Sequence, residues 1–525
     1  MKPERPFESW RVMRERRRHQ YWRAAVVGLG AGALALAFQS ALAGAEAVRI
    51  SALSFLHDAY PGLGFVIPLI ACALLGALVA WVTARFAPEA SGSGIPHVKG
   101  VLMHVASMNW LRIIPVKFLG GVLCIGSGFS LGREGPTVQM GAAVGKLVAD
   151  VLKVPPKATP RLIACGAGSG LAAAFHAPLA GFIFTIEELQ REFSALTYTM
   201  ALIAAVVGDI IATAWWGSDN VFHVEGFPAA PLRTLPLMAL VGLFAGVLGA
   251  LFNRSLLEAQ SRTQQLTSFP PWMRGALAGA ILGFSAWWLP DLAGGGHHFV
   301  ERILGDGSGI SKSLLVLAGL LAGKFLLTII SYASGVPGGI FAPMLVMGAC
   351  LGLLFGTSAS LLFPDWIPYP QSFAAIGMAA FFAAVVRAPL TGIVLVLEMT
   401  GDYHQLLPLL TGSMVAYVIS ERLGVEPVYE ALLASQLHRK HPDVPAHREP
   451  VLLEFVVQQE SAMDGKAIKE IPIPERCLFV TISRHGNDIL PDGDTILFRG
   501  DHVTAVVSGA DAGESVLRVL SLSKV

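Results

Sequence analysis

Charged residues are scarce in this sequence, and neither sign of charge is in excess. Only 14% of the 525 residues are Asp, Glu, Lys or Arg, whereas 54% are hydrophobic. A soluble domain carries about 25% charged residues. The formal net charge of +1 gives no electrostatic basis for binding nucleic acid. The composition therefore predicts a multi-pass membrane protein with small soluble extensions and no nucleic-acid partner.

The cysteines and histidines do not occur in the spacings that are typical of metal sites. The five cysteines are scattered, without metal-ligand spacing and without the pattern of a disulfide framework. The fourteen histidines contain no H-E-x-x-H motif. We therefore expect neither a metal enzyme nor a bound cofactor.

The start of the sequence lacks the character of a secretory signal. Residues 1–23 carry seven arginines ahead of the first apolar run, which is too much charge for a signal peptide. This basic segment is either a short amphipathic helix on an anionic membrane surface or a solvated tail. Under both interpretations the positive-inside rule places the N-terminus in the cytoplasm.

Long apolar runs follow. Residues 24–45 and 59–84 are long enough to span a bilayer. Later apolar segments are often short or interrupted by Gly and Pro, which predicts tilted and broken helices packed inside protein. We predict an all-α transmembrane domain at 24–435, in two halves of about 24–220 and 230–435. A charged linker at 436–449 and a cytoplasmic α/β domain at 450–525 follow, with strands at 477–483 and 495–499 and a closing helix at 514–522.

One break in the apolar region carries charge. Gly132-Arg133-Glu134-Gly135-Pro136 places an arginine and a glutamate where the chain otherwise reads as membrane. A charge at bilayer depth costs about 2.5–3.5 kcal/mol, so it needs a partner or a function. The glycines release the regular helix, and Pro136 suits the first turn of a new one. We expect a broken helix whose N-terminus faces an anion, with Glu134 in the gap.

This stretch belongs to an internal repeat. Its Gly, Pro, Met and Ala residues recur in order from position 132 to position 339, an offset of 207. A second echo relates 177–181 to 388–392 at an offset of 211. Paired broken segments in two halves indicate a binding site near the bilayer midplane.

The repeat separates scaffold from chemistry. Glu134 aligns with Phe341, and Glu188 aligns with Met399, so these carboxylates are not needed to make the fold. Glu187 aligns with another glutamate, Glu398. We therefore expect Glu187 and Glu398 to be structural, as caps or partners within each half.

At this point a family resemblance is clear. Three segments resemble, in order and spacing, the signature motifs of the CLC family of chloride channels and proton-coupled chloride antiporters: Gly92-Ser93-Gly94-Ile95-Pro96, Gly132-Arg133-Glu134-Gly135-Pro136 and Gly339-Ile340-Phe341-Ala342-Pro343. The resemblance covers about residues 20–435. It implies a CLC-type fold of two inverted-topology halves, and a homodimer with one anion pathway in each subunit of the bilayer-embedded protein.

The resemblance also implies which residues bind the anion. The chloride-binding set is the Ser93 hydroxyl, the backbone N–H groups of Ile340 and Phe341, and the Tyr429 phenol. Such a set makes physical sense, because helix N-termini attract an anion without trapping it. Supporting residues would be Gly132, Arg133, Gly135, Pro136 and Lys117. Lys117 either adds positive potential to the pathway or is structural.

Two glutamates match the proton-handling positions of the family. Glu134 resembles the external gating glutamate, which competes with chloride as a carboxylate and swings out when protonated. Glu188 resembles the internal proton-transfer glutamate. The alternatives are that Glu134 pairs with Arg133 and that Glu188 is a packing or surface carboxylate. The sequence departs from close bacterial relatives at His97, Lys99 and His176, where those relatives tend to have acidic or amide residues.

Residues 450–525 resemble the C-terminal regulatory (TrkA-C) domain of RCK-type potassium-transport regulators. The likeness rests on Ile489-Leu490-Pro491 with Gly493-Asp494-Thr495, and on Arg499-Gly500-Asp501. It implies either a small-molecule regulatory ligand or a role in stabilising a dimer.

The leading functional hypothesis is a secondary antiporter of chloride and protons in the cell (inner) membrane, with both termini cytoplasmic. Glu188 favours exchange, because family channels commonly have an apolar residue there, and Ser93 favours chloride. The alternatives are a passive voltage- or pH-gated chloride channel, an antiporter for fluoride or nitrate, and a membrane-embedded enzyme that uses Glu134 and Glu188 as acid and base. The enzyme alternative lacks a nucleophile or cofactor motif nearby.

Overall fold

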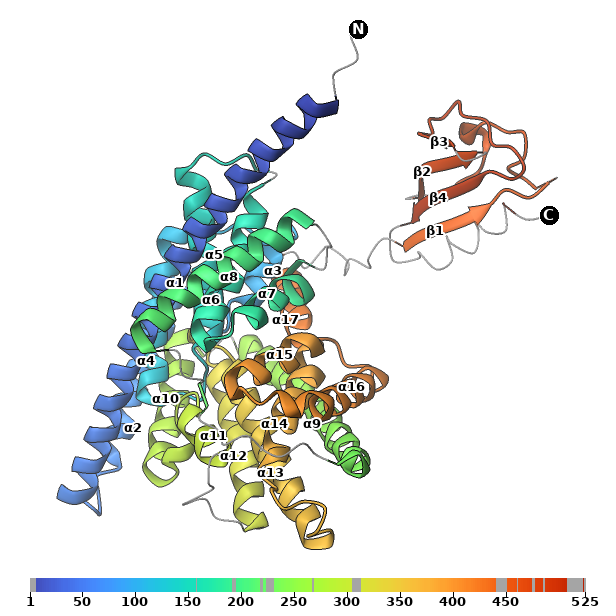
Figure 1. The fold of residues 1–525 in the computed structure, drawn as a ribbon. Coiled ribbons are helices and arrows are strands. Elements are labelled where there is room, and N and C mark those ends of the chain that lie inside the picture. The colour runs from blue at the N-terminus through green and yellow to red at the C-terminus, as the bar shows by residue number, and fades with distance from the viewer. Residues whose placement is uncertain are drawn as a thin grey trace. The chain divides into compact units, whose positions relative to one another are not determined.

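The computed structural model describes residues 6–156, 158–190, 195–217, 221–222, 231–266, 269–304, 313–440, 451–459, 461–474, 477–484, 487–507 and 523. The chain divides into two compact units, Met1–Leu433 and Ala434–Val525. The first is helical and the second is built on a β-sheet (Figure 1).

The first half of the helical unit contains α1 to α8. Their bounds are α1 Pro6–Ala59, α2 Val66–Phe86, α3 Ile95–Leu102, α4 Trp110–Ser127, α5 Glu134–Val151, α6 Thr159–Phe175, α7 Pro178–Phe184 and α8 Ala195–Trp216, with η1 Pro88–Ala90 and a π-helical segment, η2, at Thr185–Gln190. The predicted span at 24–45 is only part of α1, which is continuous from the basic segment to residue 59. The predicted helix break near Gly132 is confirmed, because α4 ends at Ser127 and α5 begins at Glu134.

The second half contains α9 to α17. Their bounds are α9 Leu235–Gln265, α10 Pro271–Trp288, α11 His297–Leu304, α12 Leu314–Ala333, α13 Phe341–Leu362, α14 Ser372–Val386, α15 Pro389–Thr400, α16 Leu406–Arg422 and α17 Val428–Lys440, with η3 Leu232–Thr234, η4 Pro290–Leu292 and η5 Tyr403–Gln405. Helix α17 occupies positions 436–440 of the predicted linker, and the remainder of that linker lies outside the described residues.

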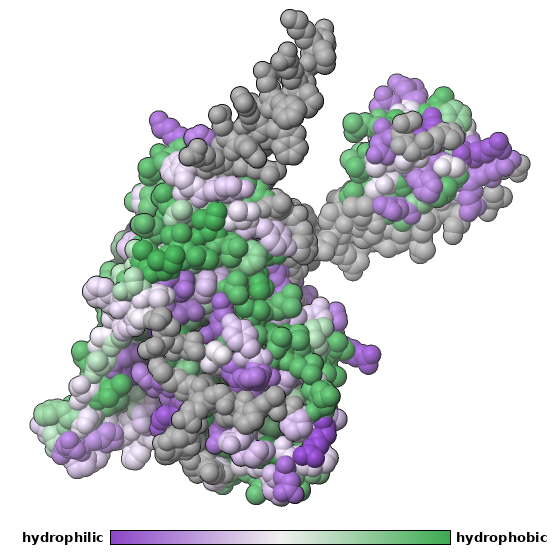
Figure 2. All heavy atoms as spheres, in the orientation of Figure 1, coloured by the Kyte–Doolittle hydropathy of each residue, from purple (hydrophilic) through white to green (hydrophobic). Residues whose placement is uncertain are grey.

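Seven helices in the described part of the chain are long and apolar enough to cross a membrane. The surface agrees with this, because Figure 2 shows hydrophobic residues spread over much of the visible face of the helical unit. Large apolar side chains such as Leu74 and Trp81 on α2 and Phe244 on α9 are exposed. In water such a surface would be costly, so it fits contact with lipid. The chain is a multi-pass membrane protein.

Glycines of the repeat let helices approach closely in each half. A Cβ on Gly141 of α5 would lie 2.2 Å from the carbonyl oxygen of Gly166 on α6. In the second half, a Cβ on Gly348 of α13 would lie 2.4 Å from the carbonyl oxygen of Gly377 on α14. The same small-residue contact between backbones is therefore built twice, as is common between membrane helices. The sequence repeat therefore corresponds to the same helix–helix contact in each half.

The two halves also cap each other. Glu398 on α15 accepts hydrogen bonds from the N–H groups of Leu179 (3.0 Å) and Ala180 (2.7 Å) at the start of α7. Glu187 on η2 accepts from the N–H groups of Leu390 (3.1 Å) and Thr391 (2.7 Å) at the start of α15. Both glutamates therefore cap a helix N-terminus, where a carboxylate is favoured. The expectation that they act within each half is wrong: each cap crosses to the other half.

The second unit is a four-stranded antiparallel sheet of order β1-β4-β2-β3. Its strands are β1 Val451–Val456, β2 Cys477–Arg484, β3 Asn487–Ile489 and β4 His502–Val507, with a short turn of helix, η6, at Ile468–Glu470. Residues such as Phe455, Ile482 and Val503 form its core. The predicted strand at 477–483 is confirmed, and the predicted helix at 514–522 lies outside the described residues.

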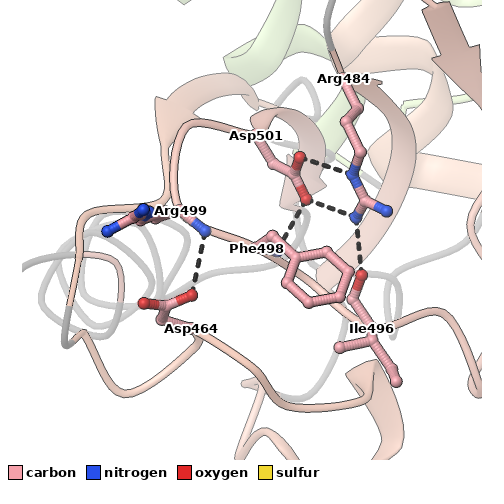
Figure 3. Close-up of polar contacts among 6 residues, drawn as sticks. All are labelled: Asp464, Arg484, Ile496, Phe498, Arg499 and Asp501. Carbon is pink, nitrogen blue, oxygen red and sulfur yellow. Dashed lines mark hydrogen bonds and ion pairs between the residues drawn. The ribbon is translucent and has the colours of Figure 1, made fainter.

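The predicted strand at 495–499 is wrong. Leu497 exchanges backbone hydrogen bonds with the loop at Gly465 and Lys466 rather than with a neighbouring strand. The strand comes later, at β4. Asp501, just before β4, accepts hydrogen bonds from Arg484 Nε (2.8 Å) and Nη2 (2.7 Å) and from Phe498 N–H (2.8 Å) (Figure 3). This hydrogen bonding raises the pKa of Arg484 and turns the chain before the strand begins.

Candidate ion-binding site

The three glycine-proline motifs meet at one place, although they are far apart in the sequence. Gly92 exchanges backbone hydrogen bonds with the segment 336–338, at 3.1 and 2.9 Å. Gly132 and Gly339 exchange a second pair, at 2.6 and 2.8 Å. Helices α3, α5 and α13 begin within three residues of these contacts. Their N-termini, each with unpaired N–H groups and a partial positive charge, therefore converge.

Gly135 makes this convergence sterically feasible. A Cβ at this position would lie 2.8 Å from the Ser93 carbonyl oxygen and 2.9 Å from the Gly339 Cα. Both obstacles are backbone atoms and cannot move aside cheaply. Gly94 is constrained differently: its φ is +81°, and a Cβ there would lie 2.2 Å from the Gln139 side-chain oxygen. The glycines predicted as scaffold therefore hold the three motifs together.

Glu134 lies at the centre of this arrangement as the first residue of α5, and it is fully buried. Its Oε2 accepts a hydrogen bond from the N–H of Ala342, at 3.3 Å, in the first turn of α13. The carboxylate thus occupies the N-terminus of another helix, which is a position suited to an anion. The sequence predicts a helix terminus that faces an anion. In this structure the negative group at that terminus is the carboxylate of Glu134.

The second neighbour of Glu134 is a histidine that sequence reasoning missed. His297 Nε2, at the start of α11, lies 3.2 Å from Glu134 Oε1. The predicted alternative partner, Arg133, forms no ion pair with Glu134 in the described residues. The sequence does show two histidines directly after three glycines at 294–296. Because His297 is 163 positions from Glu134, nothing in the local sequence indicates that the two side chains meet.

The predicted anion ligands surround the same region. Ser93 is buried; its hydroxyl oxygen accepts the Ile95 N–H at 3.3 Å, and its side chain also hydrogen-bonds to the Tyr332 phenol. Tyr429, near the start of α17, is fully buried, and its hydroxyl has no hydrogen-bond partner among the described residues. An unsatisfied buried hydroxyl costs free energy unless something binds it. Ile340 and Phe341 are also fully buried, directly at the start of α13.

Glu188 is buried beside a cation. It lies on the π-helical segment η2, where Lys99 Nζ of α3 is 2.7 Å from its Oε1. The same ammonium lies 3.4 Å from Oε1 of Glu430 on α17. Segments of π-helix are frequent at functional sites. The interpretation of Glu188 as a surface carboxylate is wrong, because the side chain is 1% exposed and paired.

The arrangement can now be compared with known proteins. The sequence profile of the family described as "Voltage gated chloride channel" matches residues 75–421, which is most of the helical unit. The chain belongs to the CLC family. A second profile, the TrkA-C domain, matches residues 452–515. The family match ends before Tyr429.

Individual relatives agree with the family assignment. The "H(+)/Cl(-) exchange transporter ClcA" of Vibrio vulnificus (strain YJ016) is 41% identical over 421 residues, covering 78% of this chain and 88% of that protein. The crystal structure of a slow cyanobacterial Cl⁻/H⁺ antiporter matches with a TM-score of 0.76 and 36% identity, covering 80% of this chain and 99% of that one. A eukaryotic CLC transporter shares the fold, with a TM-score of 0.69 and 24% identity.

Within the CLC fold of this chain, Lys117 has a clear structural contact. Its Nζ donates to the carbonyl oxygens of Ala90 (2.9 Å) and of Gly92 (2.6 Å), the first residue of the first motif. Lys324, which is 207 positions later, donates in the same way to Leu292 (3.1 Å) and Gly294 (2.7 Å). The repeated contact shows that each lysine ties down a glycine-containing loop of its own half. A contribution of Lys117 to the potential is compatible with this role.

Proposed function

We propose that this chain exchanges chloride for protons across the cell membrane, with Glu134 as the gate. The observation that carries the proposal is the hydrogen bond from Ala342 N–H to the Glu134 carboxylate at the N-terminus of α13. A chloride ion at that position would take the same N–H group and the same helix dipole. Carboxylate and chloride therefore exclude each other. Relatives named as H⁺/Cl⁻ exchange transporters support this reading.

Protonation provides the coupling. A neutral carboxyl group loses its attraction to the positive helix terminus, so it leaves and chloride enters. When chloride departs, the group loses its proton and returns. The chloride ligands in this proposal are the Ser93 and Tyr429 hydroxyls with the N–H groups of Ile340 and Phe341. The burial of Ser93 at the start of α3 and the unpartnered hydroxyl of Tyr429 support it. No arginine is needed, and binding stays weak enough for transport.

Glu188 is the second proton station in this proposal. It is buried, it is close enough to Lys99 to be held as a carboxylate, and the ammonium connects it to the half-buried Glu430. Glu430 lines a cavity of about 620 Å³ together with residues of α7, η2, α15 and α16. We infer that protons reach Glu188 from this side. A passive channel would have no need of a buried, titratable carboxylate at this place.

Assembly, orientation and regulation complete the proposal. The subunit forms a homodimer with an ion pathway in each copy, and both termini face the cytoplasm at the inner membrane. The C-terminal unit either binds a small regulatory ligand or stabilises the dimer. Deleting residues 446–525 separates these last two options: a regulatory unit changes the transport rate or its ligand response, whereas a purely stabilising unit changes only the dimer-to-monomer ratio measured by mass photometry.

Proteoliposomes loaded with chloride test the exchange directly. An outward chloride gradient should drive proton uptake, recorded with an internal pH dye, and the uptake should vanish in Glu134→Gln while chloride still flows. Chloride flux without proton movement in the unmodified protein would establish the channel alternative. Chloride flux that is outcompeted by equal fluoride or nitrate would point to another physiological anion.

A further inference from the structure

The gate has a second titratable group whose place in the proton route is open. His297 begins α11, and its Nε2 lies 3.2 Å from Glu134 Oε1. Neither atom has a well-aligned hydrogen-bond partner among the described residues, and both atoms are buried. The histidine side chain as a whole is nevertheless 24% exposed, whereas Glu134 is 0% exposed. The exposed surface therefore belongs to other atoms of the side chain.

This geometry spans the boundary between solution and gate. The His297 side chain is partly exposed, while its Nε2 is buried and faces the Glu134 carboxylate. Histidine is the side chain whose unperturbed charge change falls between about pH 5 and 8, and its two nitrogens can take a proton on one side and give it on the other. Glu134, by contrast, has no exposed surface of its own in this conformation. A proton bound for Glu134 therefore meets the histidine first.

We propose that His297 is the proton carrier between the solution and Glu134, a role that rests on the exchange function proposed above. Water protonates the ring at Nδ1, which gives an imidazolium ion. The imidazolium donates its Nε2 proton to Oε1 of the Glu134 carboxylate, which leaves a neutral imidazole and a neutral carboxyl group. The carboxyl group then leaves the α13 terminus. The ring returns its Nδ1 proton to water, and Nε2 is reprotonated by water that enters when the carboxyl group has moved. No charge or atom is left over.

Several groups around His297 affect how readily its ring is protonated. Burial lowers the pKa of the His297 imidazole and the charge of Arg133 lowers it further, whereas the carboxylates of Glu134 and Glu46 act in the opposite direction. Lys324 adds positive charge on the side of α12, since its Nζ lies 3.5 Å from where a Cβ of Gly296 would be. The ring of Phe175 on α6 packs edge-on at 6.4 Å and adds no charge. The net effect favours the neutral imidazole, so an imidazolium ion formed here readily gives up its proton.

The neighbouring His298 is a matched control. It lies on the same helix, but it is 84% exposed and faces Glu301 rather than Glu134. The carrier role therefore predicts that His297→Asn and His298→Asn differ sharply, although each removes one histidine from the same turn.

Chloride and proton flux measured together in proteoliposomes test the proposal. His297→Asn should lower proton uptake near pH 7 by about tenfold or more, a modest share of what a positioned acid-base group supplies. Its pH profile should lose the step between about pH 5 and 8, and His298→Asn should match the unmodified protein. In a Glu134→Gln background, His297→Asn should leave chloride flux unchanged, which also shows that the variant folds.

Two results would overturn the carrier role. One is a His297→Asn variant with an unchanged pH profile and unchanged proton uptake. The other is an equal loss of chloride flux in the Glu134→Gln background, which would make His297 a packing residue. Both differ from failure of the exchange function itself, in which the unmodified protein would show no chloride-driven proton uptake at all.

Discussion

Lys99 and Glu188 form a buried ion pair, with Nζ 2.7 Å from Oε1 and both side chains at most 2% exposed. The lysine comes from α3, the helix that follows the first anion motif, and the glutamate comes from the π-helical segment after α7. An ion pair this far from solvent is strong only while both partners are charged. Lys99 therefore favours the carboxylate form of Glu188, the proposed proton station, from the helix that begins within the first motif.

Removing that bias should change the pH dependence of transport. In Lys99→Met the buried carboxylate loses its counter-ion, so Glu188 binds protons more readily. We expect the midpoint of proton flux against pH on the Glu188 side to move upward by about one pH unit or more. Fluorescence-based proton uptake over a pH series measures this. Lys146→Met, which breaks an exposed pair with Asp150, is the control. An unchanged midpoint, or a shift that persists in a Glu188→Gln background, would show that the lysine does not act through Glu188.

The crossed caps should matter for stability and not for coupling. Glu187→Gln weakens the acceptor for Leu390, Thr391 and the Thr391 hydroxyl at the start of α15. We expect a loss of about 0.5–2 kcal/mol of stability, which is the usual range for a lost N-cap. Thermal unfolding in detergent measures it, and the ratio of proton to chloride flux should stay as in the unmodified protein.

The adjacent glutamate provides the contrast for the cap variant. Glu188→Gln should abolish proton coupling while chloride still moves. If Glu187→Gln uncouples transport as strongly as Glu188→Gln does, the division of the two neighbours into a cap and a proton station is wrong.

Gly135 should tolerate no side chain. In Gly135→Ala the new Cβ would press on the backbone of Ser93 and Gly339, so the three motifs must separate. Overpacking of this kind costs about 1–3 kcal/mol. We expect a lower melting temperature and a loss of chloride flux. Gly319→Ala is the matched control, because a Cβ at that position of α12 meets nothing within 4 Å. Normal chloride flux in Gly135→Ala would mean that the motifs are not in tight contact during transport.

In the C-terminal unit, Arg484 should not be replaceable by lysine. Its guanidinium holds Asp501 with two bonds and also donates to the Ile496 carbonyl (2.7 Å), while lying 4.6 Å from the centre of the Phe498 ring (Figure 3). Lysine cannot reproduce this fork. Arg484→Lys should cost about 1.5–3 kcal/mol in the unfolding of this unit, measured as faster proteolysis of the full chain after residue 450. If Arg484→Lys resisted protease as well as the unmodified protein does, the Arg484–Asp501 pair would not stabilise this unit.

Much of this site can be predicted from short sequence motifs. The glycine and proline residues around Glu134 mark the break between α4 and α5, and the repeat marks its counterpart before α13. What sequence cannot show is which distant residues complete the site. His297 reaches Glu134 across 163 positions, and Lys99 reaches Glu188 across 89. Both contacts depend on the crossing of helices from separate segments, which local periodicity does not encode.

The two wrong structural predictions, caps within each half and a strand at 495–499, also failed because of contacts between distant segments. Glu187 and Glu398 have a capping pattern, but their partners lie in the opposite half, because α7 and α15 lie side by side. In the C-terminal unit, residues 495–499 alternate like a strand, yet their backbone pairs with a loop, and Asp501 sets the start of β4. In each case, tertiary hydrogen bonding overrode a local pattern that was correctly read.

The central claim is that Glu134 and a transported anion compete for the N–H groups at the start of α13. Crystals of the Glu134→Gln variant soaked in bromide test it most directly, through anomalous scattering. We predict a bromide ion within hydrogen-bonding distance of Ala342 N–H in the variant, at the place that the carboxylate occupies in the unmodified protein, and none there when Glu134 is intact and ionised. Bromide at that place in both proteins, or in neither, would contradict the competition.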